Sequence, residues 1–403
     1  MERYQEIKER CEAARGAARA AAAASGEARA HAITGIVRRL VSDRDGILEA
    51  NRRDVDLAQG QLSEAAIARL TLDEGKLAQL CDRLLSVAAA PDPLGTVSSE
   101  LRPTGFEVAV KRAPLGAVAF AYDCRPQLTA LAVAVCVKTA NAALLSSCYA
   151  TANTDGAILR SVRDALREGP YSPDGIAYID PLHLGSAEML SRMKGTVDLM
   201  VVCGGLALGE EGGVPLVRTG GRVCHVYIDK QCDLPASVRR TVKSLYPGGE
   251  QEGRVVVLVH KDAAEDFLPA LRMAVNQYHP ELRGCPVTRE YLEDAIPAVR
   301  GDWSGADAGE TNILAVRVVE SMEMAVSHVN TYGTAHSDAI MTSHIQRAKC
   351  FERQVDSRVV WVNAPLRGSV LSDSASAALG LTGLHALTRQ KYVVSGPAEE
   401  QAI

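Results

Sequence analysis

Ala117-Val-Ala-Phe-Ala-Tyr122 is a continuous apolar run, followed by the apolar segment Leu128–Thr139 and by a second short run, Ala142-Ala-Leu-Leu145. Short runs of this kind predict strands that are buried on both faces, and the longer segment between them predicts a helix. The same alternation continues to residue 202 and resumes between residues 223 and 362. It predicts an α/β fold with two doubly wound parallel sheets, which bind ligands at the carboxyl ends of their strands.

The segments around these two series have other patterns. Residues 1–90 carry Ala and Leu at helical spacing and predict a helical layer. Phe106-Glu-Val-Ala-Val-Lys-Arg112 alternates apolar and charged residues and predicts a strand with a charged edge, and Lys391-Tyr-Val-Val-Ser395 predicts the last strand. The polar stretch from Pro280 to Ala308, with several prolines and glycines, predicts a looser connection.

Composition excludes several classes of protein. Of 403 residues, 47% are hydrophobic and 23% charged, which is the globular range. With 44 basic and 49 acidic side chains the net charge is -5, which disfavours a nucleic-acid or anionic-membrane partner. No apolar run approaches the roughly 18 residues of a membrane span. Because acidic residues interrupt the Ala- and Arg-rich start, unlike a transit peptide, we expect a soluble cytoplasmic protein.

Cysteine and histidine give no metal-binding pattern. The 10 cysteines stand singly, several of them within apolar runs, and none forms a C-x-x-C pair. This usage is typical of reduced thiols that pack as small hydrophobic groups. The 9 histidines also lack the spacing of a zinc site, so we expect no metal.

Several stretches occur together in one order. They are Ala113-Pro-Leu-Gly116, Tyr122-Asp-Cys-Arg-Pro126, Cys136-Val-Lys-Thr-Ala-Asn-Ala142, Val223-Cys-His-Val-Tyr-Ile-Asp229, Leu258-Val-His-Lys-Asp262, Ile313-Leu-Ala-Val-Arg-Val-Val-Glu320, Tyr332-Gly-Thr-Ala-His-Ser-Asp-Ala-Ile340, Val355-Asp-Ser357 and Val362-Asn-Ala364. In this order the chain resembles the gamma-glutamyl phosphate reductase family, also called glutamate-5-semialdehyde dehydrogenase, of the aldehyde dehydrogenase superfamily.

The resemblance implies a domain organisation and a reaction. It implies a cofactor-binding-like domain over residues 1–99 and 114–222, a catalytic-like domain over 223–364, and an oligomerisation arm from 100–113 and 365–403. A homo-oligomer, either a dimer or a dimer of dimers, is therefore expected. The implied reaction is reduction of L-glutamyl 5-phosphate to glutamate 5-semialdehyde by NADPH, through a cysteine thioester, as a step of proline biosynthesis.

The cysteine that this reaction requires is missing. In the family it follows an Arg-Pro shortly after the helix behind the Cys-His-Val-Tyr strand, and the matching segment here is Leu245-Tyr-Pro-Gly-Gly-Glu-Gln-Glu-Gly-Arg254. The position of the nucleophile falls near Glu250 or Gln251, and no cysteine lies between Cys232 and Cys285. A glutamate would form an anhydride, which accepts hydride poorly compared with a thioester, and glutamine is not a nucleophile.

The positions that the resemblance assigns to the oxyanion and to substrate are partly kept. Arg125 and Pro126 match the family, but Gln127 replaces the asparagine whose amide stabilises the oxyanion, a displacement of about one methylene. Asn363 and Arg367 match a family segment. Arg125, Asn363 and Arg367 are the candidate substrate-binding residues, because a guanidinium holds a carboxylate in a bidentate pair; for both arginines a structural salt bridge is the alternative.

The candidate cofactor-binding residues are Lys138, Ser146, Gly204 and Gly205. Ser146 stands where the family's Leu-Arg-Gly-Gly loop carries its cation, and Gly204 and Gly205 follow a cysteine in place of the arginine of a Pro-Arg-Gly-Gly turn. Lys138 can reach a cofactor or can cap the end of a helix in solvent. NADPH or NADP is the cofactor that the resemblance implies, although two of its cationic contacts are lost.

Three hypotheses follow. The first is a family member without thioester chemistry, a pseudoenzyme that acts as a structural or regulatory partner of an active relative or of glutamate kinase. The second is an active NADPH-dependent reductase with displaced catalytic groups, in which Cys148 or Cys203 is a relocated nucleophile rather than a packing residue. The third is a module that binds a metabolite or a nucleotide without turnover. We favour the first, because the differences affect catalytic positions whereas the apolar cores of strands and helices are retained.

Overall fold

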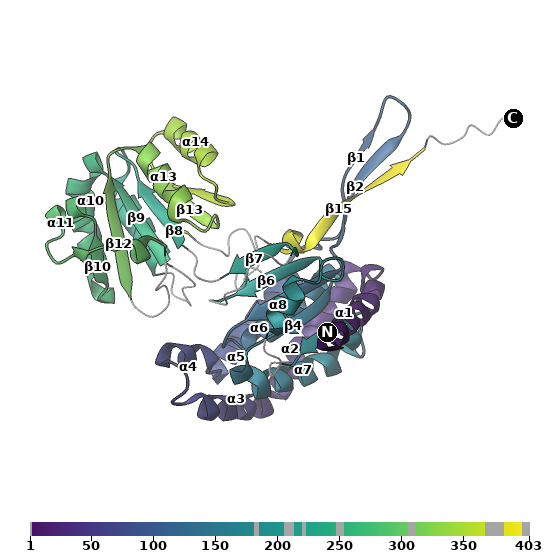
Figure 1. The fold of residues 1–403 in the computed structure, drawn as a ribbon. Helices are drawn as coiled ribbons and strands as arrows, with labels where there is room; N and C mark the ends of the chain where they lie inside the picture. Colours follow the sequence, from purple (N-terminus) through teal and green to yellow (C-terminus); the bar gives the residue numbers. More distant parts are fainter. Residues whose placement is uncertain are drawn as a thin grey trace. The chain divides into compact units, whose positions relative to one another are not determined.

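The chain divides into two compact units, and each is described by itself. The computed structural model describes residues 2–180, 185–204, 213–219, 223–246, 254–304, 312–366 and 383–396. Unit 1 comprises Met1–Thr219 with Gly368–Ile403, and unit 2 comprises Gly220–Arg367 (Figure 1). The divisions fall within three residues of the domain boundaries expected at 222 and 364, and residues 100–113 and 368–403 of the segments expected to form the arm belong to unit 1.

Unit 1 contains a parallel sheet with the strand order β5–β4–β3–β6–β7. The strands are β3 (Ala117–Tyr122), β4 (Ala142–Ser146), β5 (Ile176–Ile179), β6 (Leu199–Cys203) and β7 (Leu216–Thr219). Both neighbours of β3 are parallel to it, with Val118 opposite Ala143 in β4 and opposite Leu199 in β6. The chain runs outward from β3 to β5 and then returns to the other side of β3 at β6. The carboxyl ends of β3 and β6 therefore form a topological switch point, where sheets of this class bind ligands.

Helices cover this sheet in layers. They are α1 (Glu2–Ala18), η1 (Arg19–Ala22), α2 (Gly26–Ser42), α3 (Arg44–Ala58), α4 (Glu64–Leu70), α5 (Glu74–Ala89), α6 (Gln127–Thr139), η2 (Tyr149–Thr151), α7 (Ala152–Leu166), η3 (Pro173–Gly175), α8 (Ser186–Ser191) and η7 (Leu384–Leu387). Every residue of α6 is buried, because this helix packs on β3 and β4 while α2, α5 and α7 cover it. A helix that is apolar on all sides is stable only inside such layers, which explains the long apolar run in the sequence.

A separate antiparallel sheet projects from unit 1 as a narrow ribbon (Figure 1). It has the order β1 (Gly95–Leu101), β2 (Glu107–Pro114), β15 (Thr388–Ser395). The strands predicted at 106–112 and 391–395 are thus β2 and part of β15, and they pair with each other. The sequence analysis missed β1, whose alternation is interrupted by a register shift between Thr96 and Ser98.

Unit 2 contains a parallel sheet of seven strands in the order β11–β10–β12–β9–β8–β13–β14. Its elements are β8 (Val223–Ile228), α9 (Leu234–Leu245), β9 (Arg254–His260), α10 (Lys261–Val275), η5 (Asn276–Tyr278), β10 (Glu281–Gly284), α11 (Pro286–Tyr291), β11 (Ile296–Pro297), α12 (Arg300–Ser304), β12 (Ile313–Val319), α13 (Met322–Tyr332), β13 (Ser337–Met341), α14 (Ile345–Gln354) and β14 (Val359–Val362). The chain returns across β8 to reach β13, so the switch point lies between these two strands.

The looser connection expected between Pro280 and Ala308 is a wrong prediction. This stretch contains β10, α11, β11 and α12, and the two strands extend the sheet beyond β12. They are only four and two residues long, and β11 is exposed, so neither produces the apolar run by which the other strands were recognised. Short edge strands acquire their structure from pairing with a neighbour and not from their own sequence pattern.

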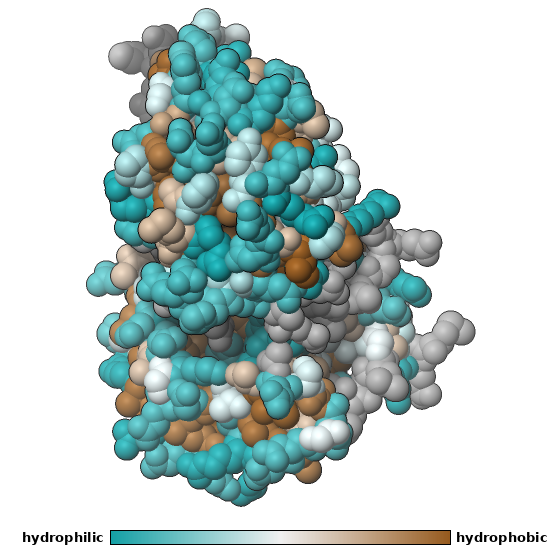
Figure 2. Space-filling model, turned by 90° about the vertical axis from the view of Figure 1, so that its left-hand side faces the viewer, coloured by the Kyte–Doolittle hydropathy of each residue, from teal (hydrophilic) through white to brown (hydrophobic). Residues whose placement is uncertain are grey.

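Figure 2 shows hydrophilic side chains over most of the face in view, with apolar ones scattered among them. Within the described ranges, no helix has the length and hydrophobicity needed to cross a bilayer. The same ranges contain no cluster of three or more His, Cys, Asp or Glu side chains arranged to hold a metal ion.

Candidate functional site

The switch point of the unit 1 sheet is formed by the residues that follow β3 and β6. Asp123 and Arg125 form an ion pair in which Arg125 Nε lies 3.3 Å from Asp123 Oδ1. Gly204, with φ of 93°, lies against the same carboxylate, because a Cβ at this position would be 2.4 Å from Asp123 Oδ2. Gly204 is therefore required by the close approach of Asp123 as well as by its left-handed backbone. Arg125, expected to hold substrate, is engaged by a neighbouring carboxylate.

Two further candidate residues lie at this carboxyl edge and are buried. Gln127 is the first residue of α6 and is 9% exposed, and Ser146 is the last residue of β4 and is 4% exposed. The Ser146 hydroxyl is 2.8 Å from the hydroxyl of Ser186, the first residue of α8. Ser146 thus joins the sheet to a helix, and it brings no positive charge to the position where the resemblance places a cation.

Two cysteines meet at the same edge. Cys124 follows β3 and Cys148 follows β4, both are partly exposed, and their Sγ atoms are 3.6 Å apart. A hydrogen bond from Cys148 lowers the pKa of Cys124 to about 7, against burial and the Asp123 charge, and Arg69 adds a smaller favourable contribution. The same contact and burial raise the pKa of Cys148. The contact between the two sulfur atoms thus favours ionisation of Cys124 over ionisation of Cys148.

A buried carboxyl group lies beneath these thiols. Asp155, in α7, accepts hydrogen bonds from Thr129 Oγ1 at 2.5 Å and from Thr151 Oγ1 at 2.6 Å, and a longer one from the Tyr178 hydroxyl at 3.4 Å. Thr151 Oγ1 also lies 3.9 Å from Cys148 Sγ. Burial raises the pKa of Asp155 to about 6, although the threonine donors oppose the shift.

Lys138 lies at the other end of α6 and not at the carboxyl edge of the sheet. It is 2% exposed, and its Nζ donates to the Ala88 carbonyl at 2.8 Å. Its own carbonyl accepts a hydrogen bond from the buried guanidinium of Arg29. Lys138 is thus neither a solvent-exposed helix cap nor placed to contact a cofactor at the switch point; it joins α6 to α5. The expectation that it reaches a cofactor is a wrong prediction, because the sequence does not show how the neighbouring helix covers this end of α6.

The switch point of the unit 2 sheet is also polar. Asp229 follows β8 and is fully buried, and Arg347 from α14 donates to both of its carboxylate oxygens at 2.6 Å. Thr342, which follows β13, donates to Asp229 Oδ2 at 2.7 Å. Burial acts to raise the pKa of Asp229, but the hydrogen bonds from Arg347 and Thr342 lower it. This group holds the ends of β8 and β13 together with α14.

Asn363 completes this edge at the end of β14. Its Nδ2 donates to the Thr342 carbonyl at 2.8 Å, and its Oδ1 accepts from the Thr342 amide at 3.0 Å. Its φ of 52° is left-handed, a conformation that asparagine tolerates better than most residues. Both polar atoms of the side chain are therefore used to fix the backbone, which accounts for Asn363 without a substrate.

The remaining candidates lie outside the described residues: Glu250, Gln251, Gly205 and Arg367. Among the thiols of unit 2, Cys224 is buried, and Cys232, Cys285 and Cys350 are partly exposed. Burial raises the pKa of Cys232, which makes its thiol a weak nucleophile. In unit 1, Cys203 is fully buried at the end of β6, so this candidate for a relocated nucleophile is inaccessible.

Sequence reasoning missed three residues of these edges: Cys124, Asp155 and Asp229. Cys124 was quoted within a family motif but was not considered as a nucleophile. Its position two residues after a predicted strand was the available signal, because that position places it at a carboxyl edge. Asp155 lies on a helix whose sequence has the usual amphipathic pattern, so nothing in the sequence indicated that its carboxyl group is buried.

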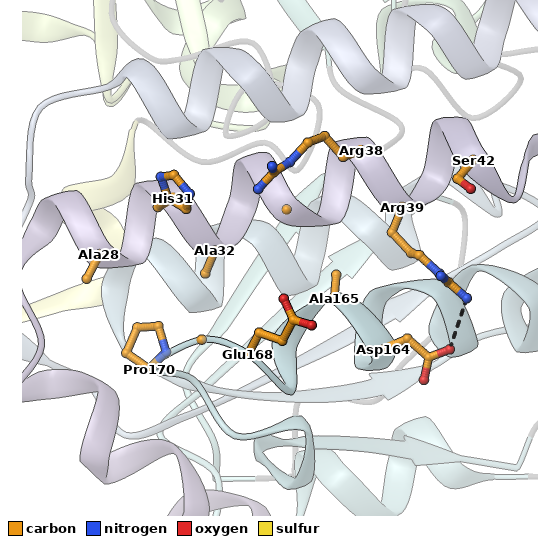
Figure 3. A pocket seen from close by; sticks show the side chains of 12 residues that line it. Ala28, His31, Ala32, Arg38, Arg39, Ser42, Asp164, Ala165, Glu168 and Pro170 are labelled. Carbon is orange, nitrogen blue, oxygen red and sulfur yellow. Dashed lines mark hydrogen bonds and ion pairs between the residues drawn. The ribbon is translucent and has the colours of Figure 1, made fainter.

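A hollow of about 720 Å³ lies elsewhere on unit 1, between α2 and the end of α7. Figure 3 shows His31 and Arg38 along α2 facing the segment that carries Glu168 and Pro170, with Arg39 paired to Asp164. None of the candidate residues lines this hollow.

Comparisons with known proteins agree with this architecture. The chain is 33% identical to a gamma-glutamyl phosphate reductase of Carboxydothermus hydrogenoformans over 404 residues, which covers 96% of this chain and 97% of the relative. It is 34% identical to one from Streptococcus suis, covering 93% and 94%. The crystal structure of the Thermotoga maritima gamma-glutamyl phosphate reductase superposes with a TM-score of 0.84 at 28% identity, covering 97% of this chain and 98% of that one. No protein-family model matches the chain.

A more distant structure defines the class. An NAD-dependent benzaldehyde dehydrogenase of Corynebacterium glutamicum has a TM-score of 0.63 at 16% identity, a likeness of fold alone. The fold, with two parallel-sheet units and an antiparallel ribbon, is thus aldehyde dehydrogenase-like. The chain belongs to the gamma-glutamyl phosphate reductase family.

Proposed function

We propose that this chain is a member of the gamma-glutamyl phosphate reductase family that no longer forms a cysteine thioester and acts as a structural or regulatory partner in proline biosynthesis. The observation that carries the proposal is the segment from Leu245 to Arg254, which contains no cysteine. A thioester requires a thiolate at the acyl carbon, and neither Glu250 nor Gln251 supplies one. The burial of Cys203 and the raised pKa of Cys232 also support it.

The described residues of the unit 1 edge do not fit the diphosphate of NADPH. A diphosphate is held by cations or by free backbone amides, often at a helix N-terminus. Here Asp123 brings a negative charge, Arg125 is paired with it, and Ser146 is bonded to Ser186. We therefore propose that NADPH binds weakly or not at all, and we assign it no step. A melting curve without a shift at millimolar NADPH is expected, because a ligand that prefers the native state must stabilise it.

The decisive assay is the phosphate- and NADP-dependent oxidation of glutamate semialdehyde, followed by the absorbance of NADPH. The Carboxydothermus hydrogenoformans relative, tested as purified protein in the same assay, is the positive control. We expect no turnover from this chain above the background without enzyme. Clear turnover that depends on both phosphate and NADP would end the proposal.

A gain-of-function series tests the reason for inactivity. Glu250→Cys and Gln251→Cys restore a thiol at the two possible positions, and Glu252→Cys is the matched control one position away. If the missing thiol is the principal loss, one of the first two variants gains acyl transfer, seen as release of phosphate from an acyl phosphate, and the control does not. Equal behaviour of all three variants would show that other losses, such as Gln127, are sufficient by themselves.

One observation favours an active enzyme as the second candidate. Cys124 is a partly exposed thiol with a pKa lowered to about 7, at the switch point of unit 1 and three residues before Gln127. We propose Cys124, in place of Cys148 or Cys203, as the residue to test for a relocated nucleophile. If the chain does turn over substrate, Cys124→Ser abolishes that activity in this case, whereas Cys232→Ser leaves it unchanged.

We also propose that the ribbon of unit 1 joins two copies of the chain. Both of its edge strands expose apolar side chains: Val97 and Leu101 in β1 are 62% and 72% exposed, and Tyr392 and Val394 in β15 are 64% and 60% exposed. Exposed edges with apolar residues pair with another chain unless they are covered. Sedimentation is expected to give a dimer or a dimer of dimers, and Val394→Lys is expected to shift the distribution toward monomer. A monomeric wild-type protein at micromolar concentration would contradict this proposal.

Two further proposals concern partners and ligands. The chain pairs with an active relative or with glutamate kinase, or it is a module that binds a metabolite or nucleotide at one of the two polar edges. Calorimetry with glutamate, proline and NADPH tests the binding module. Absence of heat and of any melting shift with all three would dispose of it.

A further inference from the structure

The topology of unit 1 brings together two thiols that are far apart in sequence. Ala121 in β3 lies opposite Ser146 in β4, and each strand ends within one residue of that pair. Cys124 and Cys148 occupy the loops that follow, 24 residues apart along the chain. Because β3 and β4 are parallel neighbours, both loops leave the same edge of the sheet, and the side chains meet there with 3.6 Å between the sulfur atoms.

We propose that Cys124 and Cys148 are a redox-active dithiol that forms a reversible disulfide by exchange with low-molecular-weight disulfides such as oxidised glutathione. This exchange requires no acyl phosphate, no NADPH and no thioester, although it shares Cys124 with the second candidate function. It places a covalent switch at the edge where sheets of this class bind their ligands.

The distance is the first argument. A disulfide bond is about 2.05 Å long. The two sulfur atoms are therefore in contact already, and they need to approach by only about 1.5 Å, a movement that side-chain rotation and a small loop shift supply. Both residues lie in loops and not within strands, so this movement breaks no sheet hydrogen bond.

Exposure is the second argument. Cys136 in α6 and Cys203 in β6, in the same unit, are fully buried and behave as core residues. Cys124 and Cys148 are both partly exposed, so an external disulfide can reach them. Reactive cysteines are recognised by such accessibility together with thiolate character, whereas structural cysteines are inert.

The two thiols also have complementary states for exchange. The pKa of Cys124 is lowered to about 7 by the hydrogen bond from Cys148, so a large fraction is thiolate at neutral pH. Cys148 has a raised pKa and holds its proton. This is the arrangement of an attacking and a resolving cysteine.

The exchange balances in two steps. The Cys124 thiolate attacks one sulfur of the small disulfide RSSR, a Cys124–S–SR bond forms, and RS⁻ leaves. Cys148 then loses its proton to RS⁻ or to solvent and attacks Cys124 Sγ, which releases the second RS⁻. Two protein thiols are oxidised to one disulfide, and RSSR is reduced to two thiols.

The disulfide would join the loop that follows β3 to the loop that follows β4. The loop of Cys124 also carries Asp123 and Arg125, and Cys148 directly precedes η2, where Thr151 holds the buried carboxyl group of Asp155. Closing the disulfide fixes these two loops to each other. We therefore expect the oxidised protein to melt at a higher temperature than the reduced protein in its unit 1 transition, and reduction with dithiothreitol to reverse this shift.

The proposal is tested by peptide mapping with mass spectrometry. The whole chain is first treated with oxidised glutathione, and its free thiols are then alkylated before the mapping. In the wild type we expect one linked peptide pair containing Cys124 and Cys148, without bound glutathione. Cys148→Ser should stop at the first step and keep glutathione on Cys124. Cys124→Ser should react at least tenfold more slowly at this site, because the activated thiol is gone. Cys232→Ser, which removes a partly exposed thiol of unit 2, should behave as wild type.

Other results would overturn the proposal. The proposal is contradicted if both thiols of the wild type can still be alkylated after the treatment. It is also contradicted by a stable glutathione adduct on wild-type Cys124, or by a disulfide from either residue to a third cysteine. The wild-type map decides the question even if one serine variant does not fold. Because the readout is chemical and needs no turnover, its failure would leave unaffected the first proposal on function, which depends on the segment from Leu245 to Arg254.

Discussion

Replacing Asp155 with asparagine should flatten the pH dependence of the stability of unit 1. The Asp155 carboxyl group is fully buried, and burial raises its pKa from the ordinary value of 3.8 to about 6. Asparagine has nearly the same shape and cannot ionise. Its Oδ1 can accept from Thr129, while its Nδ2 can donate to Thr151, whose hydroxyl then keeps the bond that it already makes to the Cys148 carbonyl at 3.0 Å. The substitution thus removes the charge and leaves few groups unpaired.

The sign follows from proton linkage. A carboxyl group whose pKa is higher in the folded state binds its proton more tightly when folded, so its stabilising contribution is complete below pH 3.8 and is lost as the pH rises to about 6. The full loss is about 3 kcal/mol, from roughly 1.4 kcal/mol for each unit of the shift. About half of it has occurred by pH 5, so linkage leaves about 1.4 kcal/mol to be lost between pH 5 and pH 8.

The assay is urea unfolding of wild type and Asp155→Asn at pH 5, 6, 7 and 8, followed by far-ultraviolet circular dichroism. Both tryptophans, Trp303 and Trp361, lie in unit 2, so their fluorescence reports that unit separately and is an internal control. Relative to wild type, the variant should gain about 1.4 kcal/mol in unit 1 from pH 5 to pH 8. A difference that stays constant with pH, or that falls as the pH rises, would refute the reasoning, as would an equal change in the fluorescence transition.

Four other substitutions, at three positions, have expected outcomes in the same unfolding assays. Arg347→Met leaves the buried carboxylate of Asp229 without its bidentate partner, and it should destabilise unit 2 by about 3–5 kcal/mol, seen in the tryptophan transition; a loss below 1 kcal/mol would contradict this. Arg29→Met removes the donor of three backbone carbonyls in unit 1, and it should cost about 3 kcal/mol by circular dichroism while the tryptophan transition stays unchanged. Asn363→Ala and Asn363→Gly lose the same two bonds to Thr342, but only alanine is strained at φ 52°, so alanine should be the less stable variant by about 1 kcal/mol; equal stability would show that the backbone relaxes.

The sequence by itself determined the parallel sheets and the family. Runs such as Ala117–Tyr122 are strands because nothing but apolar side chains can occupy a sheet covered on both faces, and a pattern of this kind is readable residue by residue. It also determined that no cysteine lies between Cys232 and Cys285, the segment in which the resemblance places the family's nucleophile. The strands β1, β10 and β11 were missed because their structure comes from pairing with neighbours.

Only the tertiary structure decided what each polar residue does. Lys138 donates a hydrogen bond to a backbone carbonyl of another helix, and Asn363 holds the backbone of Thr342. The sequence had placed both residues in the candidate site. Cys124 and Cys148, which the sequence presents as separate thiols, meet because parallel strands deliver their loops to one edge. Burial, pKa and pairing depend on which groups lie within a few ångströms in space, and the chain's linear order does not contain those distances.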